Sequence, residues 1–248
     1  MSDDPLRIAV AGASGRMGQM LIAAVNGASD LALSGKLDLG LDIRKGLEGA
    51  QVLIDFTRPE GTIAHLEVCA ELGVKAVIGT TGFDDAQKGR IAEHAKRLAI
   101  VMSPNMSVGV NVALQLLAMA SRALSGHYDI EVIEAHHRHK VDAPSGTALK
   151  MGEVIAHAIG TRLPDVAVYA REGVTGERKA GTIGFAAVRG GSIVGDHTVM
   201  YCGDHDRIEI THRAASRAIY VDGSLRAARF VAGKASGLYG MEHVLGFA

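Results

Sequence analysis

Apolar and polar positions along the first part of the chain follow a pattern that predicts strands separated by helices. Short apolar runs recur at residues 6–11, 31–37, 52–56, 74–78 and 99–102, and helices are expected at 19–25, 60–72 and 84–97. Residues 39–50 are expected to form a loop or a short helix. Continuous apolar runs of this length are typical of strands that are buried on both faces. The alternation therefore predicts a parallel sheet with right-handed crossovers.

The pattern changes from Ser107 onward. A long apolar helix is expected at 110–124, then a strand at 128–134 in which polar and apolar residues alternate, and a helix at 147–159. Four further strands are expected at 167–170, 183–189, 192–201 and 207–214, with glycine-containing turns between them. This pattern predicts an α+β domain with a mixed or antiparallel sheet. The last segment contains a helix at 223–232 and should pack back on the first domain.

A glycine-rich turn lies between the first strand and the first helix. It contains Gly12, Gly15 and Gly18 in the spacing G-x-x-G-x-x-G. Glycines at such a turn let backbone N–H groups approach a pyrophosphate that rests on a helix N-terminus. The motif alone is weak, because glycine turns are common in α/β proteins, but the strand before it and the helix after it favour dinucleotide binding. We therefore predict an α/β protein with an N-terminal Rossmann-like parallel sheet domain.

Asp38 ends the second expected strand, twenty positions after Gly18. A carboxylate at this place can accept hydrogen bonds from an adenosine ribose. An ordinary turn aspartate is the alternative, which this single position does not exclude.

Composition and charge argue against a nucleic-acid-binding, a secreted or a membrane protein. The chain has 248 residues, is 48% hydrophobic and carries a formal net charge of −1, which argues against a nucleic-acid partner. It begins directly with a strand, without the pattern of a secretory signal, and no apolar run approaches about 18 residues. We therefore expect a cytoplasmic protein without a membrane contact. Cys69 and Cys202 have no paired spacing and are expected to be buried free thiols.

A basic cluster, His136–Lys140, follows the alternating strand. The residues DAPSGT come next and open a helix, so free N–H groups lie close to the cations. This combination suggests a pocket for a small, multiply anionic substrate, with histidines that can move protons. A solvated basic loop, a nucleic-acid patch and a metal site are alternatives. The net charge speaks against the nucleic acid, and no Cys or carboxylate lies nearby at metal-ligand spacing.

Six motifs occur in one order along nearly the whole chain: GASGRMG, DFTRPEGT, VIGTTGF, NMSVGVN, EAHHRHKVDAPSGTA and REGVTGER. Together they resemble the 4-hydroxy-tetrahydrodipicolinate reductase (dihydrodipicolinate reductase) family of bacterial lysine and diaminopimelate synthesis. The resemblance implies a two-domain enzyme, usually a homotetramer. Such an enzyme reduces a cyclic, unsaturated imine dicarboxylate with NADH or NADPH and produces tetrahydrodipicolinate.

The resemblance also implies residue roles. His136 and Lys140 match the proton-transfer residues, and His137, Gly146 and Thr147 match the substrate-binding residues. Asp38 would hold the adenosine ribose, and no metal is expected. The pyrophosphate would be held by Gly12, Ala13, Ser14, Gly15, Arg16 and Met17, and the nicotinamide half by Gly79, Thr80, Thr81, Ser103, Pro104, Asn105 and Met106. Residues 1–107 and 217–248 would form the dinucleotide-binding domain, and residues 108–216 the substrate-binding and oligomerisation domain.

The chain departs from the family pattern in two places. Only sixteen residues separate Asp38 from Asp55, where the family usually has a longer connection, and Leu39 stands where the family often has Arg. Both departures concern the cofactor, and we expect NADH to be preferred over NADPH. Two other hypotheses stay open at this point: a non-catalytic nucleotide-binding sensor, and an amino-acid dehydrogenase with a similar layout.

Overall fold

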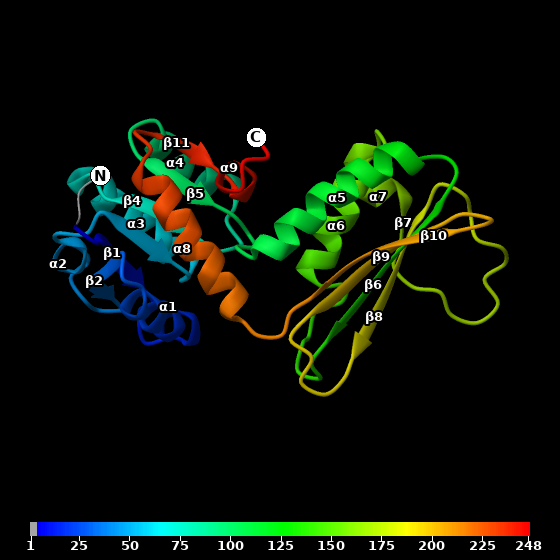
Figure 1. Ribbon diagram of the computed structural model, residues 1–248, viewed down its shortest axis with the longest axis horizontal. Helices are drawn as coiled ribbons and strands as arrows, with labels where there is room; N and C mark the ends of the chain where they lie inside the picture. The colour runs from blue at the N-terminus through cyan, green and yellow to red at the C-terminus, as the bar shows by residue number, and fades with distance from the viewer. Residues whose placement is uncertain (1–3) are drawn as a thin grey trace. The chain divides into compact units, whose positions relative to one another are not determined.

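The computed structural model describes residues 4–248, which divide into two compact units (Figure 1). One unit contains the residues up to Val108 together with Ala218–Ala248, and the other contains Gly109–Arg217. The chain therefore leaves the first unit once and returns to it. The expectation that the first unit binds a dinucleotide and the second a substrate stays a prediction.

The first unit is built on a six-stranded sheet of order β11-β5-β4-β3-β1-β2, in which every pairing is parallel. The strands are β1 Leu6–Ala11, β2 Leu31–Leu37, β3 Val52–Asp55, β4 Lys75–Ile78, β5 Ala99–Met102 and β11 Gly237–Tyr239. The helices are α1 Arg16–Gly27, α2 Ile43–Leu47, α3 Pro59–Leu72, α4 Asp85–Ala95, α8 Ala218–Ala232 and α9 Met241–Val244.

Helices cover both faces of this sheet, which explains its apolar strands. In β1, Ile8 and Val10 belong to one buried cluster, together with residues of α1, α8 and α9. Ala9 and Ala11 belong to a second cluster, with residues of α2, α3 and α4. Because successive side chains of a strand point to opposite faces, the four residues Ile8 to Ala11 are all buried, whereas Arg7 near the start of β1 is exposed. The predicted parallel, Rossmann-like sheet is confirmed.

The C-terminal segment belongs to the same unit. β11 pairs with β5, with Gly237 opposite Ala99. Helix α8 begins at Ala218, five residues before the predicted start, and its side chains Val221 and Leu225 lie in the buried cluster that α1 also joins.

The shortened connection after β2 is compact. It contains α2, whose first turn is capped by the Asp42 side chain accepting from the N–H of Lys45 at 3.2 Å. A Cβ added at Gly35 of β2 would lie 1.8 Å from the carbonyl oxygen of Gly46 in α2. The helix therefore packs with its backbone directly on the strand, at a distance that only glycine permits.

The second unit contains a five-stranded mixed sheet of order β10-β9-β6-β8-β7, as predicted. β6 runs parallel to β8 and antiparallel to β9, and β9 runs antiparallel to β10. The strands are β6 Asp129–His136, β7 Ala167–Val168, β8 Ile183–Arg189, β9 Asp196–Cys202 and β10 Arg207–Arg213, and the helices are α5 Val108–Leu124, α6 Gly146–Ala158 and α7 Leu163–Val166. The largest differences from the expected boundaries are in three strands: β6 continues to His136, β7 is reduced to two residues after the unpredicted α7, and β9 begins only at Asp196.

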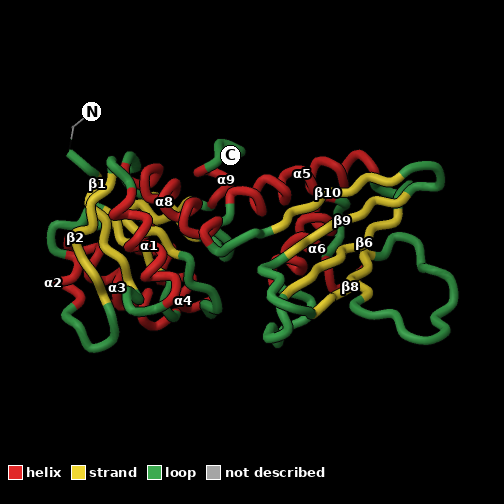
Figure 2. The backbone as a smooth tube through the Cα atoms, turned by 60° about the horizontal axis from the view of Figure 1, so that its bottom comes forward, coloured by secondary structure: helices red, strands yellow, loops and turns green. Residues whose placement is uncertain are grey.

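One face of the mixed sheet packs against α5 and α6 (Figure 2). Val132 and Val199 point into this core with Leu117 of α5 and Ile155 of α6. The buried Tyr201 hydroxyl is bonded to Ser121 at 2.8 Å and donates to the carbonyl of Leu117. On the opposite face, Ile133 of β6 and Val188 of β8 are exposed.

Two smaller expectations have mixed outcomes. Cys69 is a buried free thiol, but Cys202 is only half-buried, so that part of the prediction is wrong. Over residues 4–248, none of the helices has both the length and the apolar character that a membrane span needs.

The contact between Gly35 and Gly46 predicts a stability difference between two glycine substitutions. Gly35→Ala should destabilise the first unit by about 1–3 kcal/mol, the usual cost of inserting a methyl group into a packed site. Gly89→Ala is the matched control, because Gly89 is exposed inside α4 and an added Cβ meets nothing within 4 Å. It should stabilise by about 0.5–1 kcal/mol, the helix preference of alanine over glycine. Urea denaturation measures both, and a Gly35→Ala chain as stable as the wild type would contradict the close contact.

Candidate functional site

The glycine-rich turn joins β1 to the open start of α1. Gly12 has φ +69°, a left-handed conformation that favours glycine. A Cβ added at Gly18 would lie 2.1 Å from the carbonyl oxygen of Gly12, so the first turn of the helix lies directly on the loop. Gly15 occupies the N-cap position without a capping side chain. The first N–H groups of α1 are therefore directed at the space where an anion can bind.

Asp38, the residue after β2, lies beside this turn. Its carboxylate accepts from the backbone N–H of Ser14 at 2.9 Å and from the Ser14 hydroxyl at 3.0 Å. Two predicted cofactor residues that are 24 positions apart are thus in contact. The next residue, Leu39, is fully exposed, and Arg44 of α2 forms an ion pair with Glu71 of α3.

The segments after β4 and β5 lie at the same edge of the sheet, because the carboxyl ends of parallel strands meet at one edge. Gly79 leaves room for the ring of Phe56, which lies 2.2 Å from where its Cβ would be. The Thr80 hydroxyl is buried, accepts from the N–H of Thr57 at 3.0 Å and is bonded to the Thr62 hydroxyl at 2.9 Å. The Thr80 side chain therefore makes its hydrogen bonds inside the protein, whereas Thr81 is exposed.

Asp55 at the end of β3 is the centre of that interior network. Its carboxylate is 1% exposed and accepts from the Thr57 hydroxyl at 2.6 Å. His65 of α3 binds the other oxygen through Nδ1 at 2.8 Å. The motif DFT is visible in the sequence, but the sequence patterns assigned no role to Asp55 or His65. A carboxylate that follows three buried strand residues is a signal that could have found them, because a buried charge needs partners.

The turn after β5 is held by its own side chains. Ser103 donates its hydroxyl to the carbonyl of Asn105 at 2.9 Å, and the Asn105 side chain accepts from the N–H of Ser107 at 2.9 Å. Pro104 is exposed. Met106 is 1% exposed and its side chain belongs to the apolar core, so only its backbone is left to line a ligand site.

In the second unit, β6 brings His136 to the start of the turn that leads to α6. His136 is 8% exposed, and its Nδ1 lies 2.6 Å from Glu134 Oε2. The other oxygen of Glu134 accepts from the N–H of Ser145 at 3.1 Å, and Arg189 of β8 donates to both oxygens. Burial alone would raise the pKa of Glu134, but the hydrogen bonds from Arg189 and His136 outweigh it and hold this pKa below its usual value.

Within the same turn, Lys140 forms an ion pair with Asp142 at 2.9 Å. A hydrogen bond from Lys140 lowers the pKa of Asp142. Ser145 caps α6, with its hydroxyl accepting from the N–H of Ala148 at 3.2 Å. Gly146 and Thr147 are therefore the first two residues of the helix, which starts one residue before the predicted start, and a Cβ at Gly146 would meet nothing within 4 Å.

His197 of β9 is buried and contacts both Ser145 and His136. It is 4% exposed, its Nε2 lies 2.9 Å from the Ser145 hydroxyl, and its ring meets that of His136 edge-on with centroids 5.1 Å apart. Burial, followed by the nearby His136, lowers the pKa of His197 to about 4. The sequence motifs assigned no role at this site to His197, Glu134 or Arg189.

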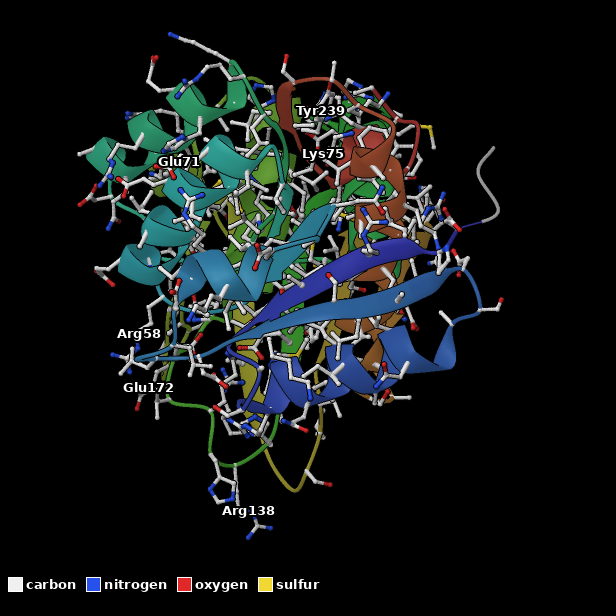
Figure 3. The ribbon with its side chains drawn as sticks, turned by 90° about the vertical axis from the view of Figure 1, so that its left-hand side faces the viewer. Arg58, Glu71, Lys75, Arg138, Glu172 and Tyr239 are labelled. Carbon is white, nitrogen blue, oxygen red and sulfur yellow. The ribbon has the colours of Figure 1, made fainter. Side chains whose placement is uncertain are left out.

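Arg138 pairs with neither of the nearby carboxylates Glu131 and Glu134. Glu131 is paired with Arg171 and Arg178, and Glu134 with Arg189. Arg138 is exposed and extends away from the ribbon (Figure 3). In the part of the chain that the structure describes, no three His, Cys, Asp or Glu side chains are grouped to hold a metal ion.

Two family models match consecutive parts of the chain. The model described as "Dihydrodipicolinate reductase, N-terminus" matches residues 6–106, and "Dihydrodipicolinate reductase, C-terminus" matches residues 109–245. The chain belongs to the dihydrodipicolinate reductase family. The resemblance inferred from the sequence motifs is confirmed.

Relatives within the family agree with this. The 4-hydroxy-tetrahydrodipicolinate reductase of Herminiimonas arsenicoxydans is 59% identical, over 97% of this chain and 98% of its own length. The enzyme of Janthinobacterium sp. (strain Marseille) is 57% identical over the same shares. Both alignments extend over 263 positions, more than the 248 residues of this chain, so these relatives carry residues that this member of the family lacks.

Solved structures support the fold. A dipicolinate-bound dihydrodipicolinate reductase from Paenisporosarcina sp. TG-14 superimposes with a TM-score of 0.81 at 24% identity, covering 96% of this chain and 99% of its own. A probable dehydrogenase from Thermotoga maritima has a TM-score of 0.59 at 13% identity, covering 96% and 92%. At these identities the likeness concerns the fold alone.

The low pKa of His197 predicts a pH dependence of stability. Between pH 6.5 and about 4 the unfolded chain binds a proton at this residue that the folded chain does not. Above pH 6.5 the unfolding free energy therefore contains the full contribution of neutral His197. This contribution is lost as the pH falls towards 4. From pH 7 to pH 5, the wild type should lose about 2 kcal/mol more unfolding free energy than His197→Gln, because one pKa unit is about 1.4 kcal/mol.

Urea denaturation at the two pH values measures this difference. Glutamine is chosen because its amide can still bind the Ser145 hydroxyl but does not titrate. Equal losses in the wild type and the variant would show that His197 is not held neutral.

Proposed function

We propose that this chain reduces a cyclic, unsaturated imine dicarboxylate with NADH or NADPH, giving tetrahydrodipicolinate, within bacterial diaminopimelate and lysine synthesis. The observation that carries the proposal is the grouping of His136, Lys140 and the N-terminus of α6 around one turn of the second unit, in a chain whose two parts both match the family models. The reaction needs a hydride, a proton and a place for two carboxylates, and each can be assigned to particular residues.

The first unit would hold the cofactor, which supplies the hydride when bound. Support comes from the left-handed Gly12, the close approach at Gly18 and the start of α1 without a capping side chain, which together suit a pyrophosphate. Asp38 would accept from the adenosine ribose and is held beside the turn by Ser14. The nicotinamide half would lie near the ends of β4 and β5, against the segments 79–81 and 103–106.

The second unit would hold the substrate. Two carboxylates require N–H donors, which the His137 ring and the backbone of Gly146 and Thr147 would supply. Hydride addition to a conjugated imine leaves electron density on the ring, and a proton must follow. Lys140 would act as the general acid, and His136 would donate or relay the proton near neutral pH.

We also propose that the protein is a homotetramer of the cytoplasm. The exposed apolar side chains on the outward face of the mixed sheet, Ile133 and Val188, suit a contact between second units. A sensor that binds the nucleotide without turnover would use the same fold but would not need a proton donor. The assay below distinguishes it from a reductase.

The test of the function is oxidation of NADH or NADPH by the purified chain with freshly generated substrate. The wild type should turn over, and Lys140→Ala should lower kcat by about 10²–10⁴-fold, the usual contribution of a general acid. Lys150→Ala is the matched control, since Lys150 is an ion-paired lysine on the surface of α6. The same preparation should sediment as a tetramer. No turnover in the wild type, or an unchanged kcat in Lys140→Ala with weaker cofactor binding, would contradict the assignments.

The cofactor site predicts a preference for NADH of at least about tenfold in kcat/KM, equivalent to ~1.4 kcal/mol. The Asp38 carboxylate accepts from a ribose 2′-hydroxyl but repels a 2′-phosphate. Leu39 offers no guanidinium to bind that phosphate, and Arg44 is engaged by Glu71. The values of kcat/KM for NADH and for NADPH are measured at the same ionic strength, because salt screens the repulsion between Asp38 and the 2′-phosphate.

Two arginine substitutions sharpen this comparison. Leu39→Arg should raise kcat/KM for NADPH, whereas Leu41→Arg, at another exposed leucine of the same connection, adds the same charge three positions after Asp38 instead of directly after it and should not. Equal use of both cofactors by the wild type would show that another cation binds the phosphate.

A further inference from the structure

Glu134 is a buried charge that none of the roles above explains. Its side chain is 1% exposed and lies on the inward face of β6, in line with Ile130 and Val132. An ionised carboxylate is costly to bury unless donors surround it. Glu134 has four: His136 Nδ1 at 2.6 Å, the N–H of Ser145 at 3.1 Å, and two N–H groups of Arg189 at 2.8 and 2.7 Å.

The Arg189 guanidinium acts as a clamp: its terminal nitrogens are engaged by other parts of the protein and are not available to bind the substrate. Besides the two bonds to Glu134, its terminal nitrogens donate to the carbonyls of Val188 and Asp142, each at 2.7 Å. These four contacts match the four N–H groups that the two nitrogens carry. The clamp joins β8 to β6 and to the turn that contains Lys140.

The charge state of Glu134 decides how His136 is protonated. The pKa of Glu134 is held low by the hydrogen bonds from Arg189 and His136, against the effect of burial. An ionised carboxylate is only an acceptor, so the proton of this hydrogen bond belongs to His136 Nδ1. Nε2 is then the nitrogen of His136 that remains for proton exchange with the substrate.

We propose that Glu134 is a positioning residue, whose carboxylate fixes the tautomer of His136 and, through Ser145, the place where α6 begins. It holds the proposed proton-transfer and substrate-binding groups in one arrangement without touching the substrate. The inference rests on the proposed function for the role of His136, but the hydrogen bonds themselves can be tested without turnover.

The space around His136 supports this assignment. A Cβ added at Gly195 would lie 3.0 Å from His136 Nε2 and 3.4 Å from Cδ2, closer than side chains normally tolerate. His197 meets the ring edge-on from another side. The imidazole is therefore enclosed by Glu134, His197 and Gly195, and its orientation is set by the folded chain.

The first experiment measures the tautomer by NMR of the ring nitrogens in histidine-labelled protein, at a pH where His136 is neutral. The wild type should show His136 with its proton on Nδ1. Glu134→Gln replaces two acceptor oxygens by one acceptor and one donor, so the His136 signals should move towards the Nε2–H tautomer. Glu131→Gln is the matched control: Glu131 lies on the same strand and is also paired with two arginines, but belongs to the opposite face. It should leave the His136 signals unchanged.

The second experiment separates positioning from general support of the fold. Glu134→Gln should lower kcat by about 10²-fold, the cost of a misplaced reacting group, and leave the dissociation constant for the cofactor unchanged. Gly195→Ala leaves Glu134 and its donor groups chemically unchanged, but it places a methyl group 3.0 Å from His136 Nε2, which displaces the ring or obstructs that nitrogen. Gly195 does not have a positive φ, so alanine strains no backbone there. It should lower kcat about tenfold, with the proton still on Nδ1.

Several results would overturn the proposal. They are a wild-type His136 with its proton on Nε2, a folded Glu134→Gln whose tautomer and kcat equal those of the wild type, and a Gly195→Ala variant with unchanged kcat. If Glu134→Gln does not fold, the wild-type tautomer and the Gly195→Ala rate decide. Absence of turnover in the wild type would reject the proposed function, whereas the NMR result would still stand or fall by itself.

Discussion

The second unit depends on one electrostatic requirement: the carboxylate of Glu134 lies in the protein interior and has to be neutralised. Removing one partner of a buried ion pair usually costs about 3–5 kcal/mol, because the remaining charge is left uncompensated. The donors come from three places, namely His136 at the end of β6, Arg189 of β8 and the start of α6 at Ser145. The turn between β6 and α6 has little regular structure, and these bonds hold its two ends in place.

The first unit also contains a buried carboxylate that is surrounded by hydrogen-bond partners, at the end of β3. Asp55 is as deeply buried as Glu134 and binds His65 of α3 and the hydroxyl of Thr57. Through Thr57 the network reaches Thr80, which follows β4. In each unit a buried carboxylate near the carboxyl end of a strand ties together loops that are distant in sequence. The segment 79–81 after β4 and the turn between β6 and α6 carry some of the residues proposed to bind cofactor or substrate, so these two buried carboxylates support parts of both proposed sites.

The strands β1, β3, β4 and β5 could be predicted because they are largely buried on both faces and read as apolar runs, whereas the three-residue β11 contains no such run and was not predicted. Boundaries were less predictable where side-chain bonds decide them: α6 starts at Gly146 because Ser145 caps it, and β6 reaches His136 because Glu134 holds that histidine inward. Arg189 could not be assigned from the sequence, since it lies 55 positions from Glu134 and only the parallel pairing of β6 and β8 brings them together.

Some glycines of this chain are required by close packing, whereas others stand where a larger side chain would fit. At Gly18 and Gly35 an added Cβ would overlap a backbone carbonyl, so packing alone explains the residue. At Gly146 a Cβ would meet nothing within 4 Å and φ is not positive, so folding does not require glycine there. Alanine would favour the helix by about 0.5–1 kcal/mol. Exposed Gly89 is equally open, but Gly146 stands at the first helical position, directly after the residue that Glu134 fixes. Glycine there keeps the backbone N–H groups at the start of α6 accessible to a carboxylate, which is the role that the proposed reaction requires of them.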